Sequence, residues 1–177
     1  AEMLARAVGP TGSVLAVNPP GLGARVAPAM AERKARLPNI TTLDAQFDDV
    51  RLAPASLDAA LFHLTYHDAY WESAQFGLNR SDPARLLREL FAAMRPGGGV
   101  VVIGHVGRPG VDPRVEAEAT HRIDPAVVRA DFARAGFRLE AESQAWRVDG
   151  DDPAKSVFDA GLRGRTDRVA YRFRKPR

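Results

Sequence analysis

The stretch LFAAMRPGGGVVVI, residues 90–103, contains the sharpest change of pattern in the chain. Its first half completes an amphipathic helix that Ser81 or Asp82 caps and Pro83 opens. Pro96 blocks continuation of that helix, and the three glycines after it allow a tight reversal. The run 100–103 then predicts a buried strand. The apolar face of the helix contains Leu86, Leu87, Leu90, Phe91 and Met94.

Strands and helices alternate on both sides of this stretch. We expect helices at 2–8, about 24–37 and 124–135, and strands at 13–18, 40–45, 57–64, 137–147 and 168–173. Pro28 must then lie in the first turn of its helix. The middle strands are apolar throughout, which predicts one mostly parallel α/β sheet with helices on both faces. No helix separates the last two strands, so we expect them to pair antiparallel at one edge.

The composition is that of a soluble globular domain. The chain has 177 residues, of which 45% are hydrophobic and 27% charged, and it has no cysteine, which excludes disulfides and thiolate metal sites. No apolar run approaches the roughly 18 residues of a membrane span, and no signal-peptide pattern is present. The net charge is +3, and the basic cluster 163–177 is interpreted as a solvated edge strand with a tail. We therefore expect no nucleic acid or membrane partner and a cytoplasmic location.

The sequence around several turns resembles the class I S-adenosylmethionine-dependent methyltransferases. The stretch 90–103 is similar to that family's helix, its Pro-Gly-Gly turn and its fifth strand, 56–62 to the entry of its fourth strand, and 8–17 to the end of its first helix and its second strand. The resemblance covers nearly the whole chain and implies a single Rossmann-like domain over 1–177. Two stretches, 64–68 and 156–167, are also similar to a group of bacterial predicted methyltransferases.

Two features depart from the family's pattern. The family's first strand and the glycine-rich turn after it, which cradles the methionine part of the cofactor, have no counterpart, and we expect the domain to be N-terminally incomplete. Gly21 and Gly23 are no substitute, since they follow the strand that resembles the second. The acidic residue that ends this strand in the family is Asn18 here. An amide oxygen still accepts from a ribose hydroxyl, but it has no negative charge.

The expected cofactor site follows from a rule of open α/β sheets, in which ligands bind at the carboxyl ends of strands. That rule selects Asn18, Asp44, the segment 63–71 and His105. By resemblance, Asp44 and Ala45 lie beside the adenine, with the carboxylate accepting from the exocyclic amine. The expected cofactor-binding residues are Asn18, Asp44, Ala45 and His63. Alternatively, Asp44 only caps a turn.

The segment 63–71 is dense in groups that move protons or line a pocket. Methyl transfer requires an aligned nucleophile and, for oxygen or nitrogen, removal of its proton. Histidine suits this task because its pKa lies near neutrality. We expect His67 to be the base and Asp68 to orient it, with a substrate pocket formed by Tyr66, Tyr70, Trp71 and His105. Alternatively, the aromatic side chains are core packing and His67 is a satisfied polar residue.

A metal site is the less favoured interpretation of the same segment. His63 and His67 are four residues apart with Asp68 adjacent, but a strand end followed by a loop does not place them on one helical face. No third ligand is evident unless His105 or His121 joins them. We therefore expect no metal.

Three functions remain. The first is a methyltransferase that uses S-adenosylmethionine to methylate an unidentified small-molecule substrate. A homodimer is compatible with this function. The second is a truncated or degenerate methyltransferase-like domain with a non-catalytic binding or assembly role. The third is a metal-dependent hydrolase that uses the four histidines. Cofactor binding separates the first two, and metal analysis tests the third.

Overall fold

A computed structural model describes all residues, 1–177. The chain divides into two compact units, which are described separately. Unit 1 comprises residues 1–50 and 73–79, and unit 2 comprises residues 51–72 and 80–177. The expectation of a single domain stays a prediction.

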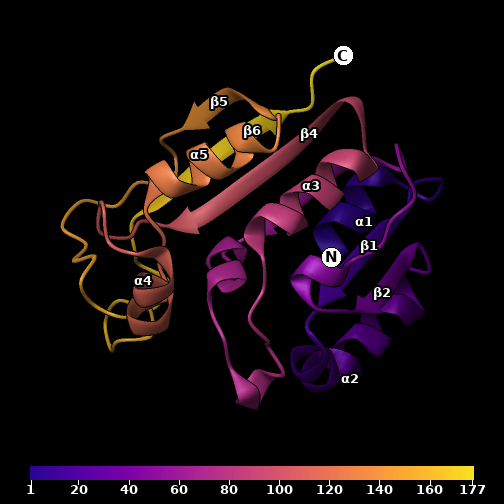
Figure 1. The fold of residues 1–177 in the computed structure, drawn as a ribbon. Helices are drawn as coiled ribbons and strands as arrows, with labels where there is room; N and C mark the ends of the chain where they lie inside the picture. The colour runs from indigo at the N-terminus through magenta and orange to yellow at the C-terminus, as the bar shows by residue number, and fades with distance from the viewer. The chain divides into compact units, whose positions relative to one another are not determined.

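Unit 1 is a small α/β unit (Figure 1). Its elements are α1 (Glu2–Val8), β1 (Val14–Asn18), α2 (Pro20–Arg36), β2 (Ile40–Asp44) and the 3-10 turns η1 (Phe47–Asp49) and η3 (Ala74–Phe76). Strands β1 and β2 pair in parallel, from Val14 opposite Ile40 to Asn18 opposite Asp44. The core consists of Ala5, Val14, Met30 and Ile40. The side chain of Asn39 donates hydrogen bonds to the carbonyls of Ala5 and Gly9, both at 3.0 Å, which ties the loop before β2 to α1.

The start of α2 corrects the sequence-based boundary. The helix begins at Pro20, and Pro28 lies in its interior rather than in its first turn. Pro20 has the fixed φ that suits the first helical position. A Cβ at Gly21 would lie 2.4 Å from the carbonyl oxygen of Phe76, and a Cβ at Gly23 would lie 2.1 Å from Asp44 Oδ1. The glycines are therefore needed inside the helix for close packing, and they do not mark its end.

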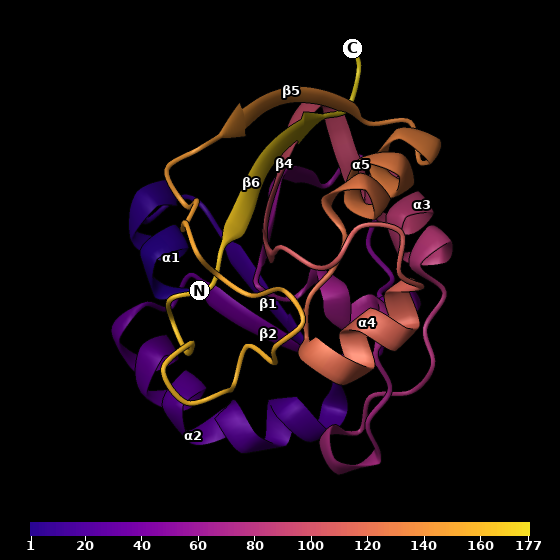
Figure 2. The same cartoon turned by 90° about the vertical axis from the view of Figure 1, so that its left-hand side faces the viewer.

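Unit 2 contains a four-stranded sheet in the order β3-β4-β6-β5, of which Figure 2 labels β4, β6 and β5. Its strands are β3 (Leu57–His63), β4 (Met94–His105), β5 (Arg138–Ser143) and β6 (Arg168–Arg174). Strands β3 and β4 are parallel, and β6 runs antiparallel to β4 and to β5. This confirms the mostly parallel arrangement with an antiparallel hairpin at the end of the chain.

Two of the helices of unit 2 bury one face of this sheet. The helices are α3 (Pro83–Ala93), α4 (Pro113–Thr120) and α5 (Pro125–Arg134), and the 3-10 segment of unit 2 is η2 (Tyr66–Tyr70). Asp82 and Asp124 cap α3 and α5 by accepting backbone N–H bonds, as the sequence predicts. Leu87 of α3 and Phe132 of α5 pack into one cluster with Val102 of β4, and the Phe132 ring stacks on that of Phe173 at 4.3 Å.

Hydrogen bonding divides the strands into two sheets, one in each unit, where the sequence predicts one sheet. That all strands share one layer stays a prediction. No strand of the chain pairs with the free edge of β1 or of β3. Strand β5 also ends at Ser143, earlier than predicted, and α4 was not predicted at all. None of the helices combines the length and the apolar character that crossing a bilayer requires.

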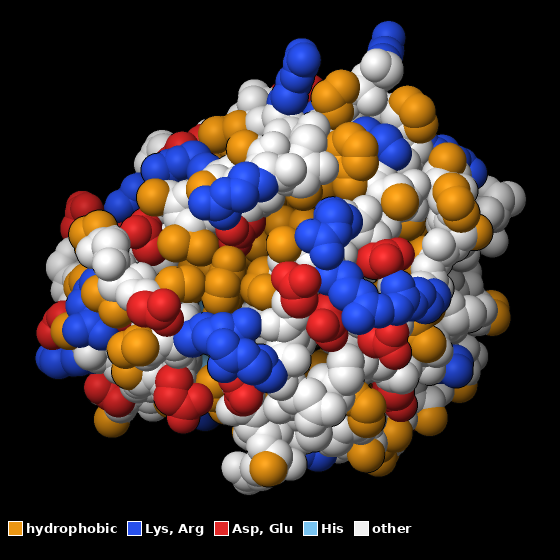
Figure 3. Space-filling view, in the orientation of Figure 1, with side chains coloured by type: hydrophobic (Ala, Val, Ile, Leu, Met, Phe, Trp, Pro, Cys, Tyr) orange, Lys and Arg blue, Asp and Glu red, His pale blue; other side chains and the backbone are white.

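The basic C-terminal segment is engaged in local interactions. Arg172 and Arg174 both pair with Glu140, at 2.8 and 2.7 Å, and Lys175 Nζ donates to the carbonyls of Phe91 and Met94. On the face drawn in Figure 3, Lys and Arg side chains are interspersed with Asp and Glu side chains. The interpretation as an edge strand is wrong, because β6 lies between β4 and β5 and buries Val169, Tyr171 and Phe173. Its arginines instead pair with Glu140 of the edge strand β5.

Candidate functional site

In unit 1, three of the residues expected to bind a cofactor lie together at the carboxyl ends of two strands. Asn18 and Asp44 are pairing partners at the last position of β1 and β2. The amide of Ala45 donates to the carbonyl of Asn18 at 2.9 Å. This arrangement follows directly from parallel pairing, since parallel strands end at the same edge of a sheet.

Asn18 and Asp44 also line a cavity of about 490 Å³. Its other walls come mainly from apolar side chains of α2, with Lys34 and Thr42 as further polar members. A flat apolar ring that carries hydroxyl or amine groups suits such a lining, because the amide and the carboxylate are both hydrogen-bond acceptors. The space is therefore chemically suited to a nucleoside.

The glycines at the start of α2 do not form an open cradle for a ligand. The space beside Gly21 is filled by the backbone of Phe76, and the space beside Gly23 is filled by the Asp44 carboxylate. Unit 1 thus offers groups for a nucleoside but no glycine-rich turn of the kind that holds the methionine part of S-adenosylmethionine.

In unit 2, the structure brings His67, Asp68 and His121 together. One ligand atom from each lies within 4.8 Å of those of the other two. His67 and Asp68 belong to η2, and His121 is the residue that ends α4, with a left-handed φ of 53°. His63, which the sequence paired with His67, is not part of this cluster; it is exposed at the end of β3, with its ring 6.4 Å from that of Trp146.

His67 is buried, with only 4% of its surface exposed. Its Nε2 lies 3.2 Å from Asp68 Oδ1, and its Nδ1 has no hydrogen-bond partner. His105, expected in the substrate pocket, is also buried, and its Nδ1 lies 2.7 Å from Thr166 Oγ1. Burial, with the His67 ring as the next cause, lowers the pKa of His105 to about 3, so its imidazole is neutral at pH 7. Burial also lowers the pKa of His121.

The aromatic side chains of η2 divide into two roles. The hydroxyls of Tyr66 and Tyr70 both donate to Asp131 Oδ2, an acceptor on α5 that the sequence analysis missed. Burial, together with Asp131, raises the pKa of both tyrosines. Tyr66 is fully buried and belongs to the core cluster, which is the alternative that the sequence left open. Trp71 packs against His121, with ring centroids 4.3 Å apart.

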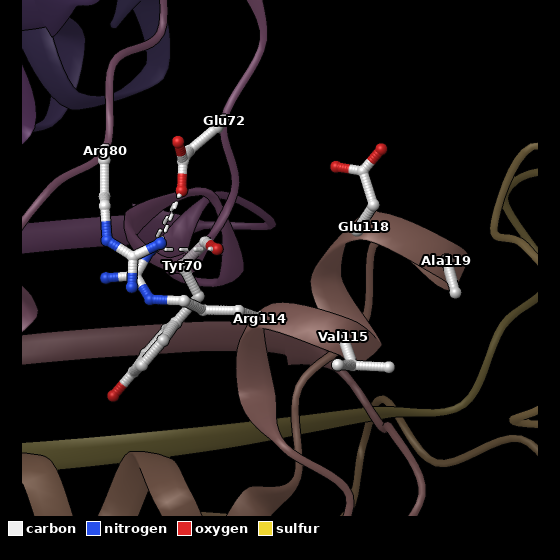
Figure 4. A pocket seen from close by; sticks show the side chains of 7 residues that line it. All are labelled: Tyr70, Glu72, Arg80, Arg114, Val115, Glu118 and Ala119. Atoms are coloured by element: carbon white, nitrogen blue, oxygen red, sulfur yellow. Dashed lines mark hydrogen bonds and ion pairs between the residues drawn. The ribbon is translucent and has the colours of Figure 1, made fainter.

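Tyr70 lines a second cavity, of about 510 Å³, in unit 2 (Figure 4). Arg80 and Arg114 both reach the Glu72 carboxylate, at 3.0 and 3.7 Å. Figure 4 shows the two guanidinium groups side by side, with Val115 and Glu118 of α4 on the other side of the cavity. The sequence analysis missed Arg80 and Arg114. The pair Asp112-Pro113 is the signal that could have located α4, since it repeats the cap that opens α3 and α5.

No known family model matches the chain, and no curated protein is similar to it in sequence.

Solved structures are similar to it. A SAM-dependent methyltransferase from Aquifex aeolicus matches 98% of this chain and 74% of its own, with a TM-score of 0.63 and 17% identity. A SAM-dependent methyltransferase from Methanosarcina mazei matches 98% of this chain and 85% of its own, with a TM-score of 0.61 and 13% identity. The chain has the class I methyltransferase fold. This confirms the fold class expected from the sequence.

The methyltransferase fold does not by itself determine the reaction. The cyclase SpnF is also similar to this chain, with a TM-score of 0.56 and 17% identity over 99% of the chain and 80% of SpnF. The function must therefore be argued from the groups that the methyltransferase fold places at its strand ends.

Proposed function

We propose that the chain is an S-adenosylmethionine-dependent methyltransferase that acts on a small molecule. The observation that carries the proposal is the position of Asn18 and Asp44. They end two paired strands of a methyltransferase fold and line an apolar cavity with acceptor groups.

On the cofactor side, the Asp44 carboxylate accepts from the adenine amine and the Asn18 amide oxygen accepts from a ribose hydroxyl. Ala45 flanks the adenine. A neutral amide at position 18 binds a ribose hydroxyl less strongly than a carboxylate does.

On the acceptor side, the reaction is a displacement at the methyl carbon. A lone pair of the acceptor forms the new bond, the bond from sulfur to the methyl carbon breaks with its electron pair left on sulfur, and the acceptor loses a proton. We assign the handling of that proton to His67 and Asp68, whose Nε2 and Oδ1 lie 3.2 Å apart. Tyr70, Trp71 and His105 are proposed to line the acceptor pocket, with Tyr66 supporting Tyr70 through their common partner Asp131.

Calorimetric titration with S-adenosylmethionine tests the proposal. Residues 1–177 include no glycine-rich turn for the methionine moiety. We therefore expect weak binding of S-adenosylmethionine by the chain as given, or none. A version with a family-type strand and glycine-rich loop added ahead of α1 should bind much more tightly. Micromolar binding by the chain as given would mean that the cofactor site lies elsewhere, and no binding by the extended version would reject the proposal. Binding without methyl transfer would favour the non-catalytic alternative.

A further inference from the structure

Three potential metal ligands converge in unit 2 from two separate elements. η2 supplies His67 and Asp68, and the end of α4 supplies His121. A tetrahedral zinc ion with bonds of about 2.0–2.2 Å to nitrogen and oxygen separates its ligand atoms by about 3.3 Å. His67 Nε2 and Asp68 Oδ1 are already 3.2 Å apart, and no pair of ligand atoms in the cluster exceeds 4.8 Å. Small side-chain rotations would therefore bring the three ligand atoms to bonding distance of one ion.

His67 has coordinating capacity that packing does not use. It is 4% exposed, and its Nδ1 is the one buried side-chain nitrogen or oxygen of the chain without a hydrogen-bond partner. Buried polar groups in folded proteins are normally hydrogen-bonded, and each exception calls for an explanation. His105, which is also buried, has its Nδ1 beside the Thr166 hydroxyl. The nitrogen of His67 that faces Asp68 is Nε2, so the ring has one nitrogen beside the cluster and one that no protein group satisfies.

The surroundings of His121 suit a metal ligand. Trp71 and Phe158 pack their rings against its imidazole, with centroids 4.3 and 4.9 Å away. These contacts hold the ring in one orientation. Asp68 and Glu118 place negative charge near it, which attracts a cation.

We infer that His67, Asp68 and His121 bind a divalent transition-metal ion, with zinc as the test ion. Two imidazoles and one carboxylate suit such ions better than magnesium or calcium, which prefer oxygen ligands. The sequence analysis did not favour a metal because no third ligand was evident beside the histidine and Asp68. In the folded chain, His121 provides this ligand. Three protein ligands leave a coordination position open for a water molecule or a substrate atom.

The metal site stands on this geometry alone, and its catalytic role rests on the proposed function. An acceptor oxygen or nitrogen bound at the open position would have a lowered pKa and would lose its proton to water before methyl transfer. His67 and Asp68 would then assist the loss of that proton by holding the ion, which keeps their proposed role at the acceptor.

Zinc titration of chelator-treated protein tests the inference. The wild-type chain should bind one equivalent. Asp68→Asn and His121→Asn should each weaken binding by at least about 10–100-fold, the loss seen even for groups that only support a ligand. Asn suits position 121 because it tolerates a positive φ. His63→Ala, which removes an exposed histidine outside the cluster, should bind as the wild type does. No zinc binding by the wild type, or undiminished binding by both ligand variants, would overturn the inference.

Melting curves distinguish a variant that has lost a metal ligand from one that is only less stable. Zinc should raise the melting temperature of the wild type and of His63→Ala, and should not raise that of either ligand variant. Each variant is compared with itself in the absence of zinc, so a lower starting stability does not obscure the result. Parallel titration of the extended version with S-adenosylmethionine separates the two claims. If the wild-type chain does not bind zinc while the extended version binds S-adenosylmethionine, the metal site alone is rejected. If the wild-type chain binds zinc while the extended version does not bind S-adenosylmethionine, the proposed function alone is rejected.

Discussion

Asn18 is the pairing partner of Asp44 in the parallel ladder of β1 and β2, so an amide and a carboxylate end adjacent strands at one edge. The pair combines a neutral acceptor with a charged one beside the same apolar cavity. Most of the polar recognition of a nucleoside there should therefore depend on Asp44.

Replacing Asp44 by alanine should weaken S-adenosylmethionine binding in the version that carries the glycine-rich loop. Hydrogen bonds to charged groups contribute about 1.5–3 kcal/mol, which corresponds to a loss of roughly 10–100-fold. Glu32→Ala, an exposed acidic residue on α2, is the matched control and should leave the affinity unchanged. Equal affinity of Asp44→Ala and the wild type in calorimetry would mean that Asp44 only caps a turn.

The two glycines of α2 should respond differently to alanine. At Gly21 the added Cβ meets the Phe76 backbone, which cannot move aside easily, so Gly21→Ala should destabilise the protein by about 1–3 kcal/mol. At Gly23 it meets the end of the Asp44 side chain, which can rotate away. Gly23→Ala should therefore cost less stability but weaken cofactor binding much as Asp44→Ala does. Urea unfolding and calorimetry of both variants check this, and the opposite order of stabilities would contradict it.

Replacing His67 by alanine should reduce turnover by about 10²–10⁴-fold, the usual contribution of proton transfer. Cofactor affinity should stay nearly the same, because His67 is assigned to the acceptor. The measurement compares turnover, cofactor affinity and melting temperature in an active extended form. A lower melting temperature with unchanged turnover would place His67 among the packing residues, and a joint loss of cofactor binding would argue against the division of roles.

The buried pair of Arg122 and Asp151 should dominate the acid stability of unit 2. Both side chains are at most 2% exposed, and Arg122 Nη1 donates a hydrogen bond to Asp151 Oδ2 at 2.6 Å. Burial by itself raises the pKa of Asp151, but the hydrogen bonds from Arg122 and from the backbone of Asp167 outweigh it, and the net pKa lies below its usual value. Because the folded-state pKa is the lower one, the stabilisation is present above about pH 4 and is lost as the pH falls below it.

Asp151→Asn should accordingly destabilise the protein by about 3–5 kcal/mol at pH 7, since it leaves Arg122 buried without its charge partner. The difference from the wild type should shrink as the pH falls below about 4. Asp159→Asn, an exposed control, should stay within about 0.5 kcal/mol of the wild type. Urea unfolding over a range of pH measures all three proteins. A difference that does not depend on pH would contradict the assigned role of the carboxylate.

The sequence predicted the helices whose first residue is determined by a capping residue next to it in the chain. The Asp-Pro pairs at 82–83 and 124–125 give the starts of α3 and α5. The start of α2 was missed because Gly21 and Gly23 look like a break in the sequence. They are in fact required by contacts with Phe76 and Asp44, which the sequence does not show.

The same distinction holds for the candidate sites. Asn18 and Asp44 could be placed together because parallel strands end at one edge, whatever the details of packing. The association of His67 with His121 could not be predicted, since it depends on how α4 packs against η2, and α4 itself was not foreseen. Asp131 was missed for a similar reason, because its partners Tyr66 and Tyr70 lie far away in the chain.

The central claim is that the adenosine part of S-adenosylmethionine binds at the ends of β1 and β2. Amide chemical shifts of the isotope-labelled chain during titration with S-adenosylmethionine test it directly, even when affinity is as weak as a Kd of about 1 mM. We expect the shifts of Asn18, Asp44 and Ala45 to change together along one weak binding curve, and the shift of Glu32, on the face of α2 away from the cavity, to stay unchanged. Shifts that change elsewhere while those of Asn18, Asp44 and Ala45 stay fixed at saturation would contradict the account.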